Sequence, residues 1–297
     1  MVWLNTLYGV LNACFILLVG PLIDGVERKI RARLQNRRGP SILQTWYDLV
    51  KLLRKPAART GVPSTLFRLS VYIGFVNLLI VSLFIPSILC GGMGFFGDLI
   101  LFIYLLSSSK VFVLIGSYSS GSPYASIGST REVSLSMASE LVLAEIIALI
   151  ALSRSSLLLS NVFPVTAVLR PSVLIGLGVL GIIVYIEHSR LPFEIGEAEP
   201  ELAGGYTIEY AGRDLGFILW SNTIRRTLLT TFLIDLIIPL DVLYHLVIYP
   251  VLLFSIMIVF TAIETGWGRL RIDISLKYVK RLSYVMWGVI LLALIGY

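Results

Sequence analysis

The chain has 297 residues, of which 57% are hydrophobic and only 14% are charged, and its mean hydropathy is +0.88. A soluble globule of this size needs more polar surface than this composition supplies, so the chain is expected to lie in a membrane. The two cysteines, Cys14 and Cys90, stand in separate apolar runs and support neither a disulfide framework nor an iron–sulfur or zinc site. His188 and His245 are also isolated, so the sequence indicates no ligand cluster for haem or a catalytic metal.

Windows of about 20 apolar residues predict eight membrane-spanning helices, because only helices satisfy their own backbone groups in lipid. The spans are expected at about 2–23, 69–90, 98–116, 132–153, 171–187, 215–240, 243–263 and 279–297. The first is expected to be retained, because a long basic segment follows it in place of a cleavage site. The sixth contains Arg225 and Arg226, so an alternative begins it after Arg226. The predicted fold class is an all-α polytopic membrane protein, with a single membrane domain over 1–297.

Basic residues gather on one side of the predicted bundle. Eleven of the 24 lie between the first and second spans and five more lie from Arg269 to Arg281, whereas the opposite side keeps only Arg154 and Arg170. The positive-inside rule therefore predicts a multi-pass protein of the cell membrane, with its basic loops in the cytoplasm and both termini outside. The inside loops are a basic one at 24–68 and an acidic one at 188–214.

The second half of the basic loop carries apolar residues at helical spacing, which predicts an amphipathic helix lying in the membrane interface. These residues are Ile42, Trp46, Leu49, Val50 and Leu53. The basic residues before it can simply obey the inside rule or bind anionic lipid. Six of them between Arg28 and Arg38 exceed what orientation requires, however, so a docking surface for an acidic partner is the sharper alternative. The residues assigned to docking are Arg28, Arg31, Arg33, Arg37, Arg38, Arg190, Arg269 and Arg271.

Six of the 18 acidic residues lie within the 26 residues from Glu187 to Gly212. Clustered carboxylates repel one another, which raises some of their pKa values and allows proton exchange near neutral pH. The segment "LPFE" is expected to hold this stretch against the bundle, so that its acids line a hydrated funnel. The alternative is a solvated loop that only forms salt bridges with the basic loop.

Seven charged residues fall inside the predicted spans, where an unpaired ion costs at least ~2.5 kcal/mol. Glu140 and Glu145 diverge by about 140° around their helix, so we assign Glu140 to the interior of the bundle and Glu145 to a wet cavity or an adjoining subunit. Interfacial placement explains Asp235 equally well. The residues predicted to couple protons or ions are Lys110, Arg131, Glu140, Glu145, Glu187, Glu194, Glu197, Glu199, Glu201, Glu209, Asp214, Arg225, Arg226 and Asp235.

Four segments follow one another along the chain: "VERK", "NRRGPSILQTWYDLVKLL", "GSPYASIGSTRE" and "EHSRLPFEIGEAEPELAGGYTIEYAG". Their order and spacing resemble the membrane-anchor subunit of respiratory complex I (subunit 1 of NADH:quinone oxidoreductase) and its counterpart in membrane-bound [NiFe] hydrogenases and formate hydrogenlyases. The short passage from "RRGPS" to "ILQTWYDLVKLL" looks like the hydrogenase branch. The resemblance implies that this chain binds no cofactor and that a [NiFe] centre and iron–sulfur clusters belong to partner subunits. The implied partners are peripheral large and small hydrogenase subunits and antiporter-like membrane subunits, with no nucleic acid.

The resemblance implies a non-catalytic subunit of an oxidoreductase complex. Such a subunit docks the peripheral redox arm and links electron transfer to the movement of H⁺ or Na⁺. A quinone-binding subunit of a complex I-type enzyme, with a headgroup pocket under "ILQTWYDLVKLL", stays open as an alternative, and so does a purely structural anchor. A stand-alone transporter is disfavoured, because the sequence shows no inverted repeat.

Overall fold

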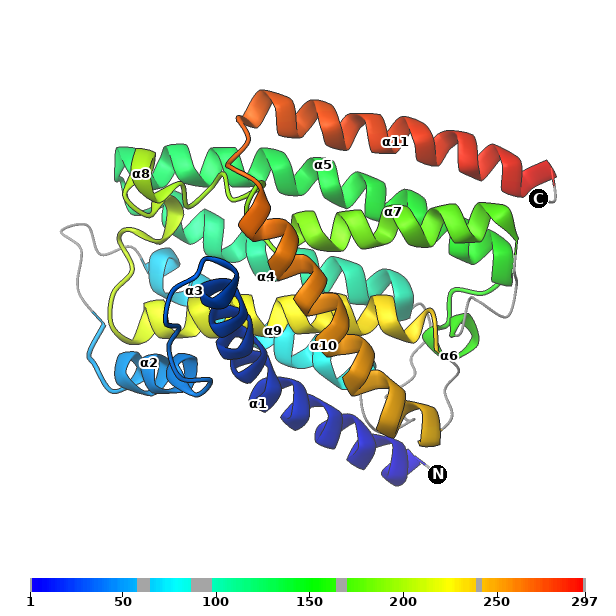
Figure 1. Ribbon diagram of the computed structural model, residues 1–297, viewed down its shortest axis with the longest axis horizontal. Helices are drawn as coiled ribbons and strands as arrows, with labels where there is room; N and C mark the ends of the chain where they lie inside the picture. Colours follow the sequence, from blue (N-terminus) through cyan, green and yellow to red (C-terminus); the bar gives the residue numbers. More distant parts are fainter. Residues whose placement is uncertain (1, 58–64, 87–97, 164–169, 239–241, 296–297) are drawn as a thin grey trace.

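The computed structural model describes residues 2–57, 65–86, 98–163, 170–238 and 242–295, and their regular structure is helical throughout. Eight long helices make up the bundle, most of them aligned with the long axis of the molecule (Figure 1). They are α1 (Val2–Leu34), α3 (Thr65–Phe84), α4 (Asp98–Tyr118), α5 (Pro123–Arg154), α7 (Pro171–Glu187), α9 (Arg213–Asp235), α10 (Val242–Gly266) and α11 (Ile272–Ile295). Short helices lie between them: α2 (Gln44–Leu53), α6 (Leu159–Val162), α8 (Glu199–Leu202) and the 3₁₀ turn η2 (Gly205–Thr207).

The long helices stand at the eight predicted positions, and the all-α membrane fold class is confirmed. Six of them, α1, α3, α4, α5, α10 and α11, are long and apolar enough to cross a membrane, and α7 is apolar but has only 17 residues. Three predicted boundaries were wrong. Helix α1 continues to Leu34. Basic side chains in its last turn interact favourably with the negative end of the helix dipole. Helix α5 begins earlier, with Pro123 in its first turn, and α11 begins at Ile272 rather than at residue 279. Helix α9 begins at Arg213, close to the predicted start at residue 215, so the alternative start after Arg226 is wrong.

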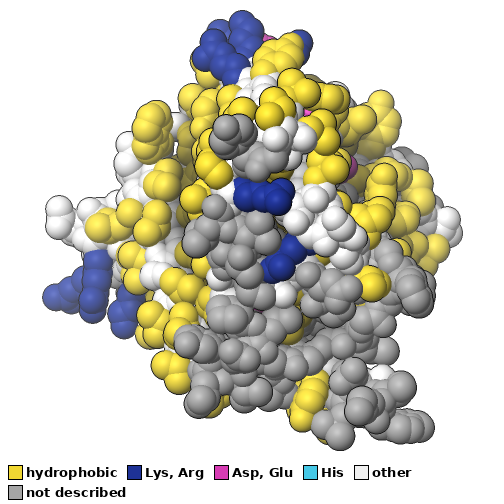
Figure 2. Space-filling model, turned by 90° about the vertical axis from the view of Figure 1, so that its right-hand side faces the viewer, with side chains coloured by type: hydrophobic (Ala, Val, Ile, Leu, Met, Phe, Trp, Pro, Cys, Tyr) yellow, Lys and Arg dark blue, Asp and Glu magenta, His cyan; other side chains and the backbone are white. Residues whose placement is uncertain are grey.

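The two termini lie toward one end of the bundle, at the right of Figure 1, whereas α2 and α8 lie at the opposite end. We call the latter the loop end, because it carries the segment of residues 188–212 between α7 and α9, hereafter the acidic loop. Figure 2 looks onto the end with the termini. Hydrophobic side chains cover most of the described surface there, and basic side chains appear in only a few separate places.

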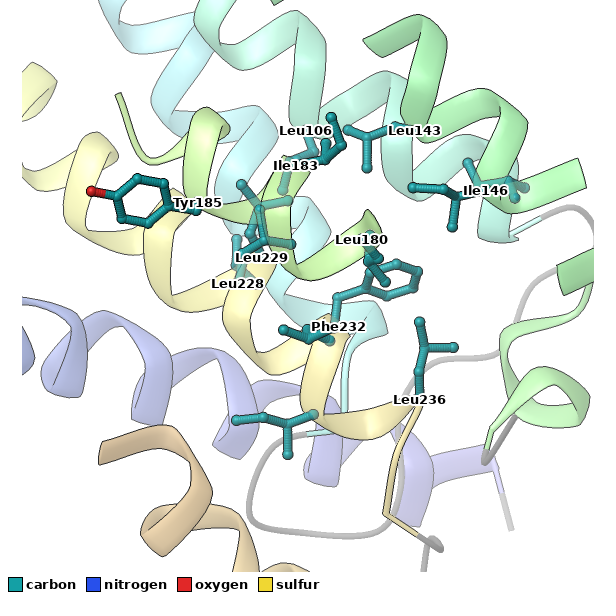
Figure 3. Close-up of a cluster of buried hydrophobic side chains, with 14 of the residues drawn as sticks. Leu106, Leu143, Ile146, Leu180, Ile183, Tyr185, Leu228, Leu229, Phe232 and Leu236 are labelled. Atoms are coloured by element: carbon teal, nitrogen blue, oxygen red, sulfur yellow. The ribbon is translucent and has the colours of Figure 1, made fainter. Parts of the chain in front are cut away.

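Helix α7 is apolar on all sides, and its buried side lies in the middle of the hydrophobic core, whereas Leu174 and Ile175 on another side are 51% and 44% exposed. Leu180 and Ile183 are fully buried, and Figure 3 shows them among side chains from three other helices. These neighbours include Leu106 of α4, Leu143 and Ile146 of α5, and Leu228, Leu229 and Phe232 of α9. The core therefore fixes the C-terminal end of α7, from which the acidic loop departs.

The predicted amphipathic helix exists as α2, but its inward face differs from the expected one. Leu49 is buried, and Trp46 meets Trp220 of α9 edge-on with the ring centroids 6.0 Å apart. Ile42 and Val50, in contrast, are 41% and 40% exposed. Ile42 precedes the helix, and Val50 points about 100° away from Leu49. One side of α2 therefore covers α9, and the other side stays open.

Candidate functional site

The acidic loop is attached to the bundle through its first residues, as "LPFE" predicts. Phe193 is buried, with its ring centroid 6.4 Å from that of Tyr185 and 5.9 Å from that of Tyr278. The hydroxyl of Tyr185 donates a hydrogen bond to the carbonyl of Leu191, and the Leu270 N–H donates to the Pro192 carbonyl over 2.9 Å. The start of the loop is thus tied to α7 and to the segment between α10 and α11.

The far part of the acidic loop packs closely on α5. A Cβ atom added to Gly128 of α5 would lie only 2.7 Å from the Tyr206 nitrogen and 2.8 Å from the Gly196 oxygen. Gly205 has a φ of +53°, which favours glycine. The Ser117 hydroxyl of α4 donates to the Tyr206 carbonyl over 2.7 Å. Small residues therefore let the loop backbone lie directly on the helices.

The acids of the loop occupy different environments. Burial raises the pKa of Glu197, whose carboxylate accepts a hydrogen bond from the buried Tyr206 hydroxyl over 2.9 Å. Glu201 is exposed, and its hydrogen bond from Arg131, 2.9 Å long, lowers the pKa of that carboxyl. Glu194 is half-buried and lies 3.3 Å from Arg269. Among these three loop acids, Glu197 is therefore the one whose surroundings favour the protonated form.

A first cluster of ion pairs lies at the loop end, around Arg190. This arginine is only 3% exposed. It forms an ion pair with Glu27, and its guanidinium lies 3.3 Å from Glu264 and 3.5 Å from Asp24. Arg190 had been assigned to docking, and the structure corrects this, because a side chain enclosed by three acids is not available to a partner.

Other residues assigned to docking divide into two groups. Arg31 lies 2.6 Å from Glu264, and Arg28 lies 3.0 Å from Asp24, so both also belong to the first cluster. Arg226 of α9 joins this cluster through Asp24 at 3.5 Å, and its Nε donates to the His188 carbonyl over 3.0 Å. The residues that stay open at the surface are Arg33, Arg37, Arg38 and Arg271.

A second cluster lies deeper in the bundle and has two parts. In the first part, Lys110 of α4 forms an ion pair with Glu132 of α5. The Ser189 hydroxyl donates to Glu132 over 2.8 Å and accepts from Lys110 over 3.1 Å.

In the second part, Glu187 at the end of α7 forms an ion pair with Arg225 of α9 and accepts a hydrogen bond from Ser139 of α5. Four of the seven charged side chains predicted within the spans are therefore in ion pairs, which lowers the cost of burying them: Lys110, Glu187, Arg225 and Arg226. Glu140, Glu145 and Asp235 have no ion-pair partner among the described residues.

A small cavity connects the acidic loop with the deeper cluster. Its volume of about 10 Å³ is close to the space that one water molecule needs. Residues from α4, α7, α9 and the acidic loop share its wall, namely Lys110, Glu187, His188, Ser189, Glu197, Tyr206, Asn222, Arg225 and Arg226. Glu197 of the loop and Glu187 of the bundle thus face the same space.

The two acids in the middle of α5 point to different sides, as predicted, but both predicted assignments are wrong, because Glu145 is the buried acid and Glu140 lines an open groove. Glu145 is buried against α11 and accepts a hydrogen bond from Ser283 over 2.6 Å. Glu140 is half-buried and accepts from Ser136 over 3.3 Å, and its side chain lines a groove of about 650 Å³ between α4 and α5. The angular separation follows from the helix, but the neighbour that each acid meets depends on the packing.

In the described part of the structure, Asp235, Asp214 and Glu209 do not join the two clusters. Asp235 is fully buried in the last turn of α9 and has no hydrogen-bond partner among the described residues. Asp214 accepts a hydrogen bond from Tyr72 over 2.9 Å in the first turn of α9, where the helix dipole favours a carboxylate. Glu209 is half-buried, and the side chain of Glu199 lies outside the described part of the structure.

The sequence of this chain matches a known protein family and several known proteins. Residues 7–295 match the family described as NADH dehydrogenase. The chain belongs to this family. It is 30% identical to formate hydrogenlyase subunit 4 of Escherichia coli (strain K12), with 99% of each protein covered. It is 31% identical to an NADH-quinone oxidoreductase subunit of Rickettsia africae (strain ESF-5), covering 69% of this chain and 65% of that protein.

Two further comparisons agree with this membership. Hydrogenase-4 component C of Escherichia coli (strain K12) is 31% identical over 78% of this chain and 75% of its own length. A solved chain from the membrane-bound sulfane sulfur reductase, an archaeal respiratory membrane complex, matches with a TM-score of 0.87 over 97% of this chain and 99% of its own, at 21% identity. That likeness shows a shared fold. The resemblance expected from the four sequence segments is confirmed.

The sequence interpretation missed several acids that this family member uses in its buried clusters. They are Asp24, Glu27, Glu132 and Glu264. Signals for them existed, because Glu132 ends the segment "GSPYASIGSTRE" and Asp24 and Glu27 stand three residues apart on one helix face. Within the described residues, no three His, Cys, Asp or Glu side chains are placed to hold a metal ion.

Proposed function

We propose that this chain is the membrane-anchor and coupling subunit of a multisubunit respiratory complex of the hydrogenase type. Formate hydrogenlyase subunit 4 aligns with nearly the whole chain, whereas the NADH-quinone oxidoreductase relative from Rickettsia africae aligns with about two thirds of it. This difference in coverage supports the hydrogenase branch. The chain itself does not carry out the redox reaction.

The observation that carries the proposal is the cavity shared by Glu197 and Glu187. From it, one branch leads through Ser189 to Lys110 and Glu132, and the other leads through Arg225 and Glu187 to Ser139. Ser139, which contacts Glu187, directly precedes Glu140 on α5, and Glu140 opens onto the groove between α4 and α5. The route thus runs from the loop end to the side of the bundle, where an antiporter-like subunit can accept an ion.

Mechanistically, electron transfer in the redox arm changes the protonation or position of the acidic loop between Glu194 and Glu209. The raised pKa of Glu197 suits this carboxyl for gaining and losing a proton. A change of charge at Glu197 alters the electric field on the ion pairs that face the same cavity. Glu140 transmits this change to the groove between α4 and α5. A charge that crosses the membrane field is worth ~2.3 kcal/mol per 100 mV, so the loop must respond closely to the redox state.

The loop end is the surface on which the redox arm docks. The exposed Arg33, Arg37 and Arg38 provide a basic surface for acidic groups of the arm. The large and small hydrogenase subunits of the arm hold the [NiFe] centre and the iron–sulfur clusters. In this proposal the loop end faces the cytoplasm and both termini face outward.

The test is ion pumping by the purified complex in liposomes, driven by its own redox reaction. Glu140→Gln lowers pumping and leaves electron transfer with artificial donors close to the wild-type rate. Asp235→Asn is the matched control, because Asp235 is a buried acid outside the route. Unchanged pumping in Glu140→Gln removes Glu140 from the route, and a structural anchor then explains the chain better.

One observation supports the quinone alternative. A cavity of about 310 Å³ lies beside α2, between α1 and α9, near the expected headgroup position. Charged side chains dominate its wall, including Asp24, Arg28, Asp48, Arg226 and Glu264. Inhibition of the complex by a quinone analogue decides in favour of this alternative.

A further inference from the structure

An apolar groove opens on the side of the bundle between α7, α10 and the start of α11. Its volume is about 540 Å³, within the range of pockets that hold small molecules. The side chains that line it include Tyr185 of α7, Phe260 of α10 and Tyr278 of α11, together with Trp267 between α10 and α11. It is separate from both charged clusters, and neither the proposed route nor the docking surface uses it.

The floor of this groove is formed by two glycines of α7. A Cβ atom added to Gly178 or Gly181 would meet nothing within 4 Å. Both are in ordinary helical conformation, so neither close packing nor backbone geometry requires glycine there. Glycine is also unfavourable in the middle of a helix. The missing side chains therefore serve to leave the groove open.

Charged and aromatic side chains border the groove in the manner of a lipid site. Ile274, Tyr278 and Arg281 of α11 fall within about 60° of one another around the helix axis. Arg271 directly precedes this helix. Arg271 is 83% exposed, and among the described residues its ion-pair partner is the exposed Asp273 at 3.4 Å. Arg281 is also exposed. Trp267 is 64% exposed, as aromatic side chains at the level of lipid headgroups often are.

We propose that this groove binds the hydrocarbon chain of a membrane lipid whose anionic headgroup contacts Arg271 and Arg281. The apolar wall matches the chain, and the two guanidinium groups match a phosphate. The bound chain also contacts Pro192 and Phe193, which form the inner wall of the groove. These residues attach the acidic loop, and Glu194 next to them pairs with Arg269. The lipid thus supports the acidic loop from the membrane side.

The experiment measures lipid retention by native mass spectrometry. The assembled complex, purified in mild detergent and stripped of lipid, is incubated with dioleoyl phosphatidylglycerol or dioleoyl phosphatidylcholine. The double variant Gly178→Leu, Gly181→Leu fills the groove and lowers the retained phosphatidylglycerol by about tenfold or more, because each buried CH₂ contributes ~0.8 kcal/mol. Gly288→Leu on α11, where an added Cβ also meets nothing within 4 Å, retains as much as the wild type.

A second pair of substitutions tests the headgroup. Arg271→Gln with Arg281→Gln removes the preference for phosphatidylglycerol over phosphatidylcholine and keeps chain binding. Equal retention by the wild type and the glycine double variant overturns the site. A photo-crosslinker at Ile274 that attaches to another subunit in place of lipid also overturns it. Because retention is measured without turnover, these results do not depend on the proposed function.

Discussion

Lys110 of α4 forms an ion pair with Glu132 of α5 inside the helical bundle. Both side chains are held by Ser189, the second residue of the acidic loop. A shift of the loop therefore changes the hydrogen bonds of a buried charge pair directly. This contact joins the acidic loop to the interior of the helical bundle.

Removing one partner of this pair is expected to destabilise the protein strongly. Lys110→Met leaves the carboxylate of Glu132 buried without its cation, which costs about 3–5 kcal/mol. The double variant Lys110→Met, Glu132→Gln recovers most of that loss, because no charge is left unpaired. Thermal denaturation of the purified complex measures both. Arg131→Gln, which breaks an exposed pair, is the control, and an equal shift in Lys110→Met and Arg131→Gln contradicts the prediction.

Arg190 is expected to be essential for the loop end. Arg190→Gln leaves Asp24, Glu27 and Glu264 facing one another without their shared cation, so assembly of the complex falls sharply. Arg190→Lys restores assembly only in part, because an ammonium group lacks the planar fork that reaches several carboxylates. The amount of assembled complex in membranes measures the effect. Normal assembly of Arg190→Gln shows that the buried cluster is dispensable.

Stability should depend on pH through Glu197. The pKa of Glu197 in the folded protein is raised above 4.5 by burial, so the folded state binds more protons than the unfolded state. Stability therefore falls as pH rises from about 4.5 through the raised pKa. Glu197→Gln removes this decrease, so its advantage over the wild type grows with pH across that window. Denaturation of the complex at a series of pH values measures it.

Glu201→Gln provides the matched control for this pH series. Arg131 lowers the pKa of Glu201, so the wild-type carboxylate contributes stability above its unfolded pKa and loses it as pH falls through the folded pKa. The substitution removes a small contribution of the opposite sign, because the pair is exposed. Identical pH profiles for the Glu197 and Glu201 variants are incompatible with the different environments of the two acids.

The close contact between α5 and the acidic loop predicts a steric effect at Gly128. In Gly128→Ala the added methyl group collides with the backbone of Gly196, Gly205 and Tyr206, so the loop must move away from the helix. A Glu-specific protease should then cut the loop faster, and ion pumping should fall. Gly266→Ala, where an added Cβ meets nothing within 4 Å, serves as the control. Wild-type cleavage of Gly128→Ala means that the loop tolerates the displacement.

The sequence predicted most of the fold because the signals for membrane helices are local. Eight apolar windows correspond to eight long helices, and "LPFE" correctly predicts the attachment of the acidic loop. The predicted spans missed the C-terminal end of α1 and the start of α5, because both helices continue with polar side chains whose partners lie elsewhere in the chain. Asp24 and Glu27, for example, continue α1 and meet Arg190, which is far away in sequence.

The sequence by itself determined that this protein lies in a membrane, where its helices stand and that its acids gather beside one of them. These properties depend on hydrophobic length and on the period of the helix, which neighbouring residues set. The tertiary structure alone decided that Arg190 faces inward, that Glu145 packs against α11 and that Glu197 shares a cavity with Glu187. A buried charge persists only where an opposite charge or a hydrogen-bond partner from another helix reaches it, and packing determines which partner that is.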